Sequence, residues 1–231
     1  MSENNPVLLL TGASSGIGAA SARLLVGEGW RLILASRSIG KLDELADELG
    51  GPDHAVAVEC DVAEWADQQA AVTVALEHYG RLDAAWANAG FGGQRGFLAD
   101  TVEHWREMVL ANVYGAALTI RAAMPALIEA KGHLLLTGSV AGRRAMPGSL
   151  YSATKHAVHA MGESVRQELD GTGVRVTVIA PGMVDTPFFA KVPLDVPLQA
   201  EDVACAVLFA LSQPPHVDVN EILVRPTAQP L

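Results

Sequence analysis

Short apolar runs alternate with longer amphipathic segments along the whole chain, and this alternation constrains the fold more than any other feature. Two of the runs, Val7–Leu10 and Val176–Ile179, consist almost entirely of leucine, isoleucine and valine. Strands of this composition are typical of parallel sheets, whose connecting helices cover both faces. Strands that alternate with helical segments indicate βαβ units. The sequence therefore predicts an α/β fold built on a doubly wound, Rossmann-like parallel sheet.

The expected elements follow one another without a linker, an internal repeat or a low-complexity tract. We predict seven strands, at Val7–Thr11, Arg31–Ser36, His54–Cys60, Leu82–Ala87, His133–Thr137, Arg175–Ala180 and Glu221–Val224. We predict helices at Ile17–Glu28, Gly40–Leu49, Glu64–His78, Val102–Ala130, Ser152–Asp170 and Ala200–Ser212. We therefore expect residues 1–231 to form a single domain.

Charge and cysteine content exclude several classes of partner. The formal net charge of −10 argues against a nucleic-acid or anionic-membrane partner, because the chain supplies no basic footprint. The two cysteines, Cys60 and Cys205, form no motif, which argues against a disulfide scaffold. The polar start of the chain lacks the basic character of a signal peptide, and no apolar run approaches membrane-spanning length. We expect a cytoplasmic protein.

A glycine-rich turn joins the first expected strand to an apolar helix. Thr11 is followed by Gly12, Gly16 and Gly18 in the spacing G-x-x-x-G-x-G. Glycines at such a turn let the backbone approach a pyrophosphate, whose charge then faces the helix N-terminus. The alternative is an ordinary strand-to-helix turn, but the position of the motif favours dinucleotide binding.

The end of the second expected strand indicates which dinucleotide. An acidic residue there would bind the ribose 2′-hydroxyl of NAD, whereas an arginine accommodates the 2′-phosphate of NADP. Here the strand runs through Ser36 into Arg37, and the first carboxylate after them is Asp43. The guanidinium can bind a phosphate through two hydrogen bonds, and Ser36 can add another. We therefore favour NADP, the alternative being that Arg37 is a solvated surface charge.

A tyrosine and a lysine lie four residues apart in Tyr151-Ser152-Ala153-Thr154-Lys155. On a helix, positions i and i+4 share a face, so the phenol and the ammonium can point into one site. A fixed cation favours the phenolate and so lowers the pKa of the tyrosine, which would then exchange protons nearer neutral pH. The alternative, a buried tyrosine beside a snorkelling lysine, is common in helices.

With these motifs in place, the chain resembles the short-chain dehydrogenase/reductase family over nearly its whole length. The resemblance rests on Thr11–Gly18 and Tyr151–Lys155, and on four further motifs. These are Asp61-Val62, Ala87-Asn88-Ala89-Gly90, Asn112 in Asn-x-x-Gly, and Pro181–Thr186, while Ser139 precedes Tyr151 by twelve residues. The residues that the resemblance implies for cofactor binding are Gly12, Ser14, Ser15, Gly16, Ile17, Gly18, Ser36, Arg37, Asp61, Val62, Asn88, Ala89, Gly90, Tyr151, Lys155, Pro181, Gly182, Val184 and Thr186.

The resemblance also implies catalytic roles. Tyr151 would exchange a proton with the substrate oxygen as general acid or base, and Ser139 would hold that oxygen by a hydrogen bond. Lys155 would lower the pKa of Tyr151 and bind the nicotinamide ribose, while Asn112 would anchor a water near Lys155. Taken singly, Ser139 could be a strand-end residue that bonds the backbone, and Asn112 an ordinary mid-helix residue.

The chain departs from the family pattern at two places. Ala87 replaces an asparagine, which should weaken a hydrogen bond in the central sheet without removing a catalytic group. The segment of residues 186–200 is shorter than the usual substrate lid, which predicts an open or shallow pocket. The ending Glu221–Gln229 resembles a subgroup that includes clavulanate-type aldehyde reductases and NADP-dependent serine or 3-hydroxy-acid dehydrogenases.

Several other side chains are weaker candidates. His156 and His159 share the Tyr151 helix, but no third ligand is recognisable, so we expect no metal site. Arg95, Arg143 and Arg144 lie in loops that the family places around the active-site mouth, where one could bind a substrate carboxylate. A solvated loop or an oligomer contact would account for them equally well. The adjacent Phe188 and Phe189 could line an apolar pocket or belong to the core.

Two helices, Val102–Ala130 and Ser152–Asp170, carry apolar residues beyond a single stripe. They are Val109, Ala116, Ala117, Ile120, Val158, Met161 and Val165. In the family these helices pair across a two-fold axis, so we expect a homodimer or homotetramer.

The motifs together predict an NADP-dependent oxidoreductase that interconverts a ketone or aldehyde with an alcohol. The alternatives are a sensor or scaffold that binds NADP without turnover, and a dehydratase or epimerase on the same fold. Because Asn112, Ser139, Tyr151 and Lys155 are all present, the sequence favours the oxidoreductase.

Overall fold

A seven-stranded parallel sheet in the order β3-β2-β1-β4-β5-β6-β7 forms the centre of the molecule. The computed structural model describes residues 5–189 and 192–229. Its strands are β1 (Val7–Thr11), β2 (Arg31–Ser36), β3 (Ala55–Glu59), β4 (Ala84–Ala87), β5 (His133–Thr137), β6 (Arg175–Pro181) and β7 (Glu221–Val224). The predicted α/β class and doubly wound parallel sheet are confirmed.

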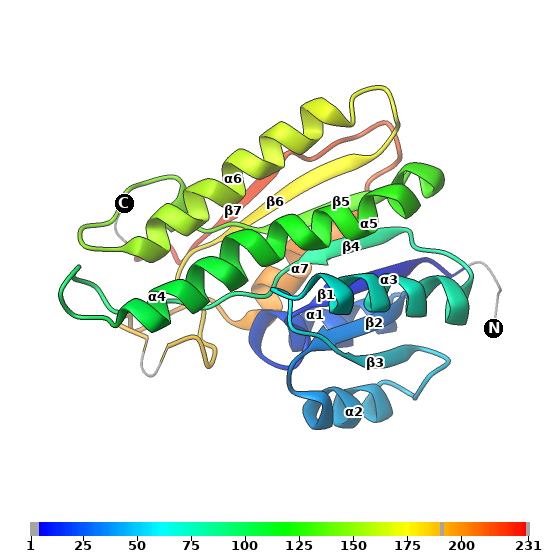
Figure 1. Cartoon of the computed structure of the whole chain (residues 1–231), viewed down its shortest axis with the longest axis horizontal. Helices are drawn as coiled ribbons and strands as arrows, with labels where there is room; N and C mark the ends of the chain where they lie inside the picture. The colour runs from blue at the N-terminus through cyan, green and yellow to red at the C-terminus, as the bar shows by residue number, and fades with distance from the viewer. Residues whose placement is uncertain (1–4, 190–191, 230–231) are drawn as a thin grey trace.

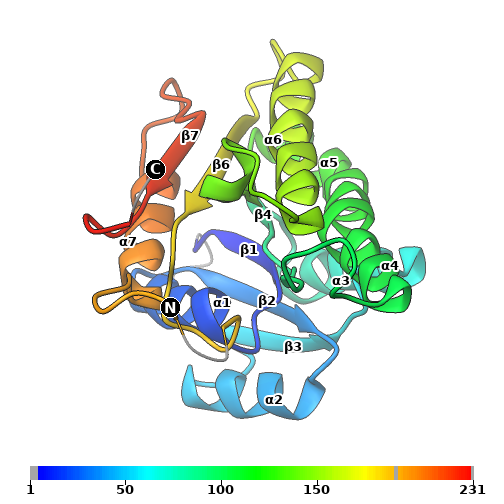
Figure 2. The same ribbon diagram turned by 90° about the vertical axis from the view of Figure 1, so that its left-hand side faces the viewer.

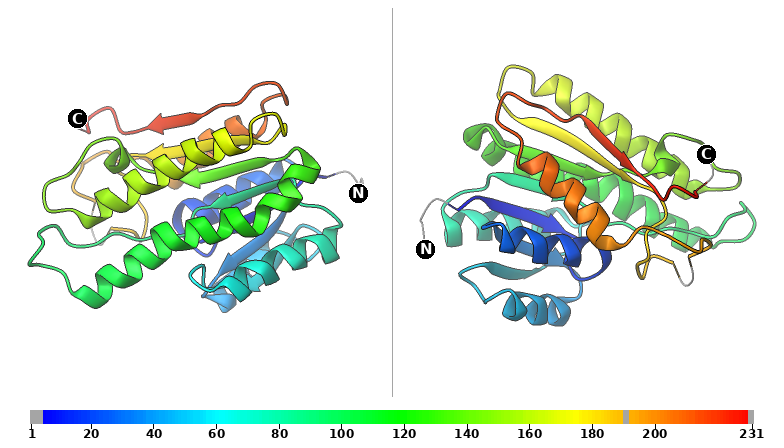
Figure 3. Two further views of the ribbon diagram at one scale, coloured as in Figure 1. Left: turned by 45° about the horizontal axis from the view of Figure 1, so that its top comes forward. Right: turned by 180° about the vertical axis from the view of Figure 1, so that it is seen from behind.

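Helices cover both faces of this sheet. They are α1 (Gly16–Gly27), α2 (Ile39–Glu48), α3 (Trp65–Tyr79), α4 (Val102–Val109), α5 (Ala116–Ala130), α6 (Leu150–Glu168) and α7 (Ala200–Leu211), with short turns η1 (Leu110–Gly115) and η2 (Val140–Gly142). Figure 1 shows α3, α4, α5 and α6 in front of the sheet, and the rear view in Figure 3 shows α1 and α7 on the opposite face. Among the described residues, no helix is both long and apolar enough to cross a membrane.

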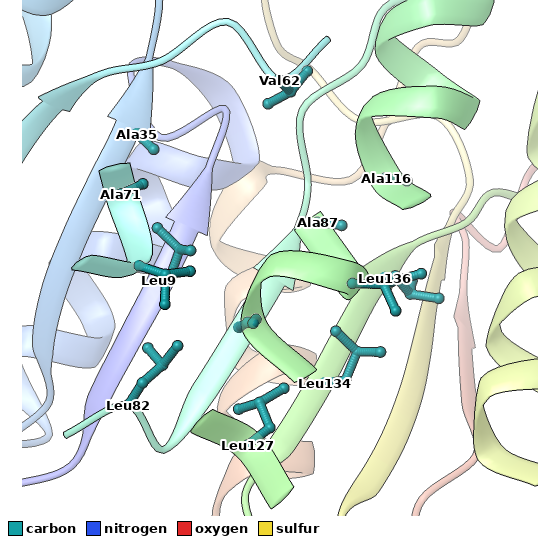
Figure 4. Packing of buried hydrophobic residues seen from close by; sticks show 14 of the residues in the cluster. Leu9, Ala35, Val62, Ala71, Leu82, Ala87, Ala116, Leu127, Leu134 and Leu136 are labelled. Carbon is teal, nitrogen blue, oxygen red and sulfur yellow. The ribbon is translucent and has the colours of Figure 1, made fainter. Parts of the chain in front are cut away.

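The apolar strands build a core on each face, because successive side chains of a strand point to opposite sides. Leu9 of β1 packs with α3 and α5, whereas its neighbours Leu8 and Leu10 pack with α1 and α7. Figure 4 shows Leu9, Leu134 and Leu136 in the first of these clusters. Since both faces are covered, β1 is fully buried, which explains its continuous apolar sequence.

The strand order reverses at β1, whose neighbours in the sheet are β2 on one side and β4 on the other. The chain moves outward from β1 to β3, then crosses back to β4 and proceeds to β7. Figure 2 shows the resulting twisted sheet, with β3 and β7 at its two edges. In open α/β sheets, ligands bind outside the carboxyl ends of the strands at such a reversal point.

The helix predicted at Val102–Ala130 is divided, which corrects the sequence-based expectation of one uninterrupted helix. The segment Leu110–Gly115 widens to a π-helical turn between α4 and α5. Pro125 lies inside α5 without ending it. Such π turns interrupt the regular i→i−4 ladder of backbone hydrogen bonds and occur often at functional sites. Asn112, a predicted site residue, lies within this turn.

Candidate active site

A cleft of about 960 Å³ opens at the carboxyl ends of the strands. It is lined by the segments that follow β1, β2, β3, β4, β5 and β6. Every residue that the sequence predicted for cofactor binding lines this cleft, and so does Ser139. Asn112 is the one predicted site residue that is not among its lining residues. The structure therefore brings the predicted residues, spread over six loops of the chain, into one place.

The glycine-rich turn is shaped by close backbone approach. Gly12 and Gly16 have φ angles of 66° and 52°, in the left-handed region that glycine tolerates best. A Cβ atom on Gly18 would lie 2.3 Å from the carbonyl oxygen of Gly12, which no side chain could tolerate. Ser15, the N-cap of α1, makes no side-chain capping hydrogen bond, so this helix end presents backbone N–H groups to the cleft. These features fit a dinucleotide pyrophosphate.

Asn88 ties the glycine-rich turn to the neighbouring strands. Its Nδ2 donates to the carbonyl oxygens of Thr11 and Gly12, at 3.1 and 3.3 Å. Its Oδ1 accepts a 2.9 Å hydrogen bond from Thr137 Oγ1, which in turn accepts one from the indole N–H of Trp86 at 2.9 Å. The floor of the cleft is therefore fixed by a network that joins β1, β4 and β5 beside the substituted Ala87.

At the opposite end of the cleft, Arg37 is exposed and lines the wall together with Ser36. Ser36 Oγ accepts a 3.1 Å hydrogen bond from the backbone N–H of Ser38. Within the part of the chain that the structure describes, the Arg37 guanidinium has no hydrogen-bond or ion-pair partner. It is thus available to an anion, and its binding of a 2′-phosphate stays a prediction.

Tyr151 lies in the first turn of α6. The sequence predicted a start at Ser152, but the helix begins at Leu150. Ser149 caps it by accepting a 3.1 Å hydrogen bond from the backbone N–H of Ser152. Tyr151 and Lys155 are both helical, so the i, i+4 geometry expected from their spacing holds. The Lys155 Nζ lies 5.7 Å from the centre of the Tyr151 ring.

Ser139 lies between β5 and η2 and faces Tyr151. Its hydroxyl accepts a 3.1 Å hydrogen bond from the backbone N–H of Ala141 and is 3.4 Å from the carbonyl oxygen of Pro181. It also interacts with the phenol of Tyr151, and this contact lowers the pKa of the tyrosine. The Ser139 hydroxyl is held between the Pro181 segment and the Tyr151 phenol. A small polar group of a ligand could contact the serine and tyrosine hydroxyls together.

Burial, rather than Lys155, dominates the pKa of Tyr151. Burial raises the pKa of Tyr151 to about 12, and the contact with Ser139 offsets this only in part. Burial also lowers the pKa of Lys155 to about 8, since the ammonium is removed from water. Burial and the Ser139 contact therefore set the pKa of Tyr151 in this structure, and the lowering of that pKa by Lys155 stays a prediction.

Asn112 is buried in η1 with its amide fully engaged. Its Oδ1 accepts a 3.0 Å hydrogen bond from Phe91 N, and its Nδ2 donates to Phe91 O at 2.9 Å and to Thr154 Oγ1 at 3.1 Å. A Cβ atom on Gly90 would lie 2.8 Å from Asn112 Oδ1 and 3.7 Å from Lys155 Nζ. Glycine at position 90 therefore lets Asn112 Oδ1 pack closely against the backbone, with Lys155 Nζ nearby.

The mouth of the cleft combines aromatic and cationic side chains. Phe188 packs edge-on against the Tyr151 ring, with 5.4 Å between centroids, and Phe189 packs against Phe188 at 4.9 Å. Both phenylalanines line the cleft, as do Arg95 and Arg144. In the predicted lid of residues 186–200, positions 190–191 lie outside the described residues, and a bridge between Val184 and Leu198 closes its base.

Arg143 does not share this location, which corrects its placement at the mouth. Its guanidinium binds the carboxylate of Glu221 at the start of β7, and Arg143 is not among the residues that line the cleft. The sequence could not distinguish it from the adjacent Arg144, because the ion pair joins residues far apart in the chain.

Gln229 and Gly92 are among the cleft-lining residues that the sequence did not predict as site residues. Gln229 lines it, and its Oε1 accepts a 2.8 Å hydrogen bond from the backbone N–H of Met183. Gly182 makes room for this contact, since a Cβ there would lie 2.2 Å from Gln229 Oε1. Gly92 likewise makes room for Phe188, whose Cζ lies 2.7 Å from the position of a Cβ. Only the glycines themselves offered a signal for such close approaches.

The two histidines of α6 have separate surroundings. His156 is exposed, with Nδ1 2.8 Å from the carbonyl oxygen of Ser152, whereas His159 is buried against Ser139. Within residues 5–189 and 192–229, no group of three or more His, Cys, Asp or Glu side chains could hold a metal ion.

Comparison with known proteins places this site in a family. The family model described as short chain dehydrogenase matches residues 6–196. An uncharacterized oxidoreductase of Staphylococcus aureus (strain USA300) is 41% identical over 224 residues, which cover 95% of this chain and 96% of the relative.

Solved structures agree along the whole chain. An alcohol dehydrogenase from the archaeon Thermococcus sibiricus, complexed with 5-hydroxy-NADP, superposes with a TM-score of 0.91 at 30% identity and covers 99% of both chains. The closed form of a serine dehydrogenase complexed with NADP+ gives 0.90 at 30% identity, covering 97% of this chain and 96% of that one. A 3-ketoacyl-(acyl-carrier-protein) reductase from Brucella melitensis, complexed with NADH, gives 0.88 at 29% identity, covering 96% and 98%. The chain therefore belongs to the short-chain dehydrogenase family of oxidoreductase enzymes.

Proposed function

We propose that this enzyme interconverts a ketone or aldehyde with an alcohol, using NADP as the hydride carrier. The observation that carries the proposal is the meeting of Ser139, Tyr151 and Lys155 in the same cleft as the glycine-rich turn. A bound nicotinamide would supply or accept the hydride. The side chains would bind the substrate oxygen and move its proton.

Tyr151 is the proposed general acid and base. In reduction, its hydroxyl gives a proton to the oxygen of the carbonyl as hydride reaches the carbon, so that an alcohol and a tyrosinate result. In oxidation, the tyrosinate takes that proton back. Ser139 donates a hydrogen bond that strengthens as negative charge develops on the substrate oxygen. Its contact with the phenol supports an oxygen binding site shared by the two hydroxyls.

Lys155 and Asn112 would complete the proton path. Lys155 carries a buried ammonium beside the Tyr151 ring, where it can stabilise the tyrosinate that forms during turnover and bind ribose hydroxyls. Asn112 Oδ1 and Lys155 Nζ both lie near Gly90, and we propose that Asn112 anchors a water near Lys155 that relays the proton toward solvent. In this proposal Asn112 binds that water, while its Nδ2 donates a hydrogen bond to Thr154.

NADP is the preferred cofactor in this proposal. The unpaired Arg37 guanidinium and the Ser36 hydroxyl at the end of β2 suit a 2′-phosphate. Two of the three superposed structures carry an NADP form, and the third carries NADH. Arg37 therefore supports NADP more strongly than the cofactors bound in these three structures do.

Replacement of Tyr151 by phenylalanine tests the reaction. Tyr151→Phe should lower the rate of NADPH-dependent carbonyl reduction by roughly 10²–10⁴-fold while leaving NADPH binding nearly intact. Tyr79→Phe is the matched control, because Tyr79 donates to the carbonyl oxygen of Pro52 outside the cleft. A panel of ketones, aldehydes and 3-hydroxy acids, followed at the reduced-nicotinamide absorbance, supplies substrates. Full activity of Tyr151→Phe would refute the assignment.

We also propose that the enzyme is a homodimer or homotetramer. Four of the apolar residues expected to pair with another subunit are instead buried within the chain's own core, which corrects that expectation in part. They are Ala116, Ile120, Val158 and Val165. Val109 of α4 and Tyr114 of η1 remain 38% and 48% exposed, and these apolar side chains support pairing through the same helices. Light scattering at micromolar concentration would detect a monomer and so contradict the proposal.

A further inference from the structure

The imidazole of His159 is buried directly beneath Ser139. His159 follows Lys155 by one turn of α6, so it lies on the helix face that also carries Tyr151 and Lys155. Its side chain is in contact with the loop that runs from Gly138 to Gly142, and the residue is only 7% exposed. The proton path proposed above does not use this histidine.

The loop fits closely around the ring. A Cβ atom on Gly138 would lie 2.5 Å from His159 Nε2, and one on Gly142 would lie 2.4 Å from His159 Cδ2. Neither glycine has a φ angle in the left-handed region, so close approach and not backbone conformation accounts for both. The two glycines on either side of Ser139 therefore seat its backbone on the imidazole.

The hydrogen bonds of the ring bear on which nitrogen carries its proton. The backbone N–H of Ser139 points at His159 Nε2 over 3.3 Å, and the carbonyl oxygen of Ser139 is 3.2 Å from the same nitrogen. If Nε2 carried the proton, it would bond the carbonyl but leave the buried N–H of Ser139 without an acceptor, which is costly. With the proton on Nδ1, Nε2 accepts from Ser139 and the buried N–H is satisfied.

The other side of the ring supports the same tautomer. Among the described residues Nδ1 has no hydrogen-bond partner, but Glu221 Oε1 lies 3.8 Å away, and the carboxylate charge attracts a proton on Nδ1 across that distance. Arg143 binds both oxygens of Glu221 and so holds the carboxylate at the start of β7. Arg143, Glu221 and His159 therefore form a chain of contacts that ends on the backbone of Ser139.

We propose that His159 is a positioning residue for Ser139. Accepting the backbone N–H fixes the peptide on which the Ser139 side chain is mounted, and so fixes the direction of its hydroxyl toward the substrate oxygen. This inference rests on the proposed carbonyl chemistry, in which a misaligned hydroxyl fails to stabilise the transition state. His159 is not among the residues that line the cleft, so we expect it to contact neither substrate nor cofactor.

The charge state of the ring is consistent with an acceptor. Burial, the largest cause, together with the nearby Arg143, Lys155 and His156, lowers the pKa of His159 to about 4, whereas the Ser139 backbone acts in the opposite direction because its carbonyl oxygen favours a protonated ring. The imidazole is therefore neutral near pH 7 and keeps a lone pair on Nε2. A group with so low a pKa would be a poor general acid at neutral pH, which separates it from Tyr151.

A double-mutant cycle tests the proposal. His159→Leu should lower kcat for carbonyl reduction by roughly 10–100-fold with little change in the dissociation constant of NADPH, since only the Ser139 hydroxyl is displaced. His159→Gln, whose amide oxygen can accept from Ser139 N–H, should recover part of this loss. In a Ser139→Ala background, His159→Leu should cost less than about twofold, because no hydroxyl remains to be positioned. His156→Leu, a change of the exposed neighbour, is the matched control.

The cycle separates this inference from the proposed reaction. Equal losses for His159→Leu with and without Ser139, at unchanged thermal stability, would overturn the positioning role while leaving the carbonyl chemistry in place. If His159→Leu does not fold, 15N NMR of the ring nitrogens in the wild-type enzyme still decides the geometry: a protonated Nδ1 and a bare Nε2 are expected. A proton on Nε2 would overturn the inference, and this readout does not depend on activity.

Discussion

The ammonium of Lys155 donates a 2.6 Å hydrogen bond to the carbonyl oxygen of Thr137, the last residue of β5. Ser139 follows two residues later, so a single contact fixes the α6 face that carries Tyr151 against the segment that carries the serine. The bond also holds the charge in place: Lys155 is only 4% exposed, and its side chain has no freedom to snorkel to the surface.

This arrangement should make the proposed binding of NADPH dependent on pH. Burial lowers the pKa of Lys155 to about 8, so the side chain is charged below that pH and becomes neutral above it. NADPH is an anion, so its affinity should be highest below pH 8 and should fall as the pH rises through that value. Fluorescence titration of NADPH between about pH 6.5 and 9.5 would measure the slope.

Lys155→Met, which keeps the length of the side chain without the charge, provides the comparison. The variant should bind NADPH more weakly at pH 7, lose roughly 10²-fold or more in kcat/KM, and show a flat affinity profile across this range. An unchanged slope in Lys155→Met would assign the titration to another group.

The glycine-rich turn offers a matched pair of substitutions in one helix. Gly18→Ala would place a Cβ atom 2.3 Å from the carbonyl oxygen of Gly12, so the turn must shift. We expect a loss of about 1–3 kcal/mol in the free energy of unfolding. NADPH affinity should also fall at least tenfold, because the shifted backbone is the one that faces the pyrophosphate. Urea unfolding and NADPH titration would measure the two effects.

Gly27→Ala is the control, since no atom lies within 4 Å of its Cβ position at the other end of α1. It should leave NADPH affinity unchanged and be neutral or stabilising by up to about 1 kcal/mol, because alanine restricts the unfolded chain. Comparable losses of NADPH affinity in the two variants would show that this affinity does not depend on the close packing at Gly18.

The proposed preference for NADP should depend on Arg37. Arg37→Ala removes a charge-assisted contact of about 1.5–3 kcal/mol, so the KM for NADPH should rise by roughly 10–100-fold while the parameters for NADH stay nearly constant. Lys41→Ala, an exposed cation on the adjoining helix α2, controls for the general loss of positive charge. Equal effects of Arg37→Ala on both cofactors would contradict the assignment.

The sequence predicted the sheet and most of the cleft because their signals are local. Apolar runs such as Val7–Leu10 identify buried strands, and the spacing of Gly12, Gly16 and Gly18 identifies the turn. The i, i+4 relation of Tyr151 and Lys155 follows from helix geometry alone, so it survived an error of two residues in the start of α6.

What the sequence could not predict depends on contacts between distant residues. Leu110–Gly115 contains no proline, yet this segment widens where the Asn112 amide binds Phe91 and Thr154. The ion pair between Arg143 and Glu221 spans 78 positions, and no periodicity distinguishes Arg143 from Arg144. The pKa of Tyr151 also follows from burial in the finished fold, which spacing does not reveal.

His133, at the start of β5, should make the fold sensitive to acid. Thr177 Oγ1 donates to the carbonyl oxygen of Val219 over 2.6 Å, so the His133 Nε2 at 2.7 Å must donate to Thr177. The ring is 2% exposed, and among the described residues its Nδ1 has no hydrogen-bond partner. Burial, together with the nearby charge of Arg175, lowers its pKa from 6.5 to about 3.

The sign of the effect follows from proton uptake on unfolding. Between pH 6.5 and about 3 the unfolded chain binds a proton at His133 that the folded chain does not. The stability that His133 contributes is therefore complete above pH 6.5 and is lost as the pH falls, at up to about 1.4 kcal/mol per pH unit.

His133→Leu removes this titration, so urea unfolding at pH 7, 6, 5 and 4 should show a shallower decline in the free energy of unfolding than in the wild type. His216→Leu, a change at an exposed site, should follow the wild-type curve. Parallel curves for wild type and His133→Leu would mean that the buried ring gains its proton within the folded protein, and the acid sensitivity would then belong to other groups.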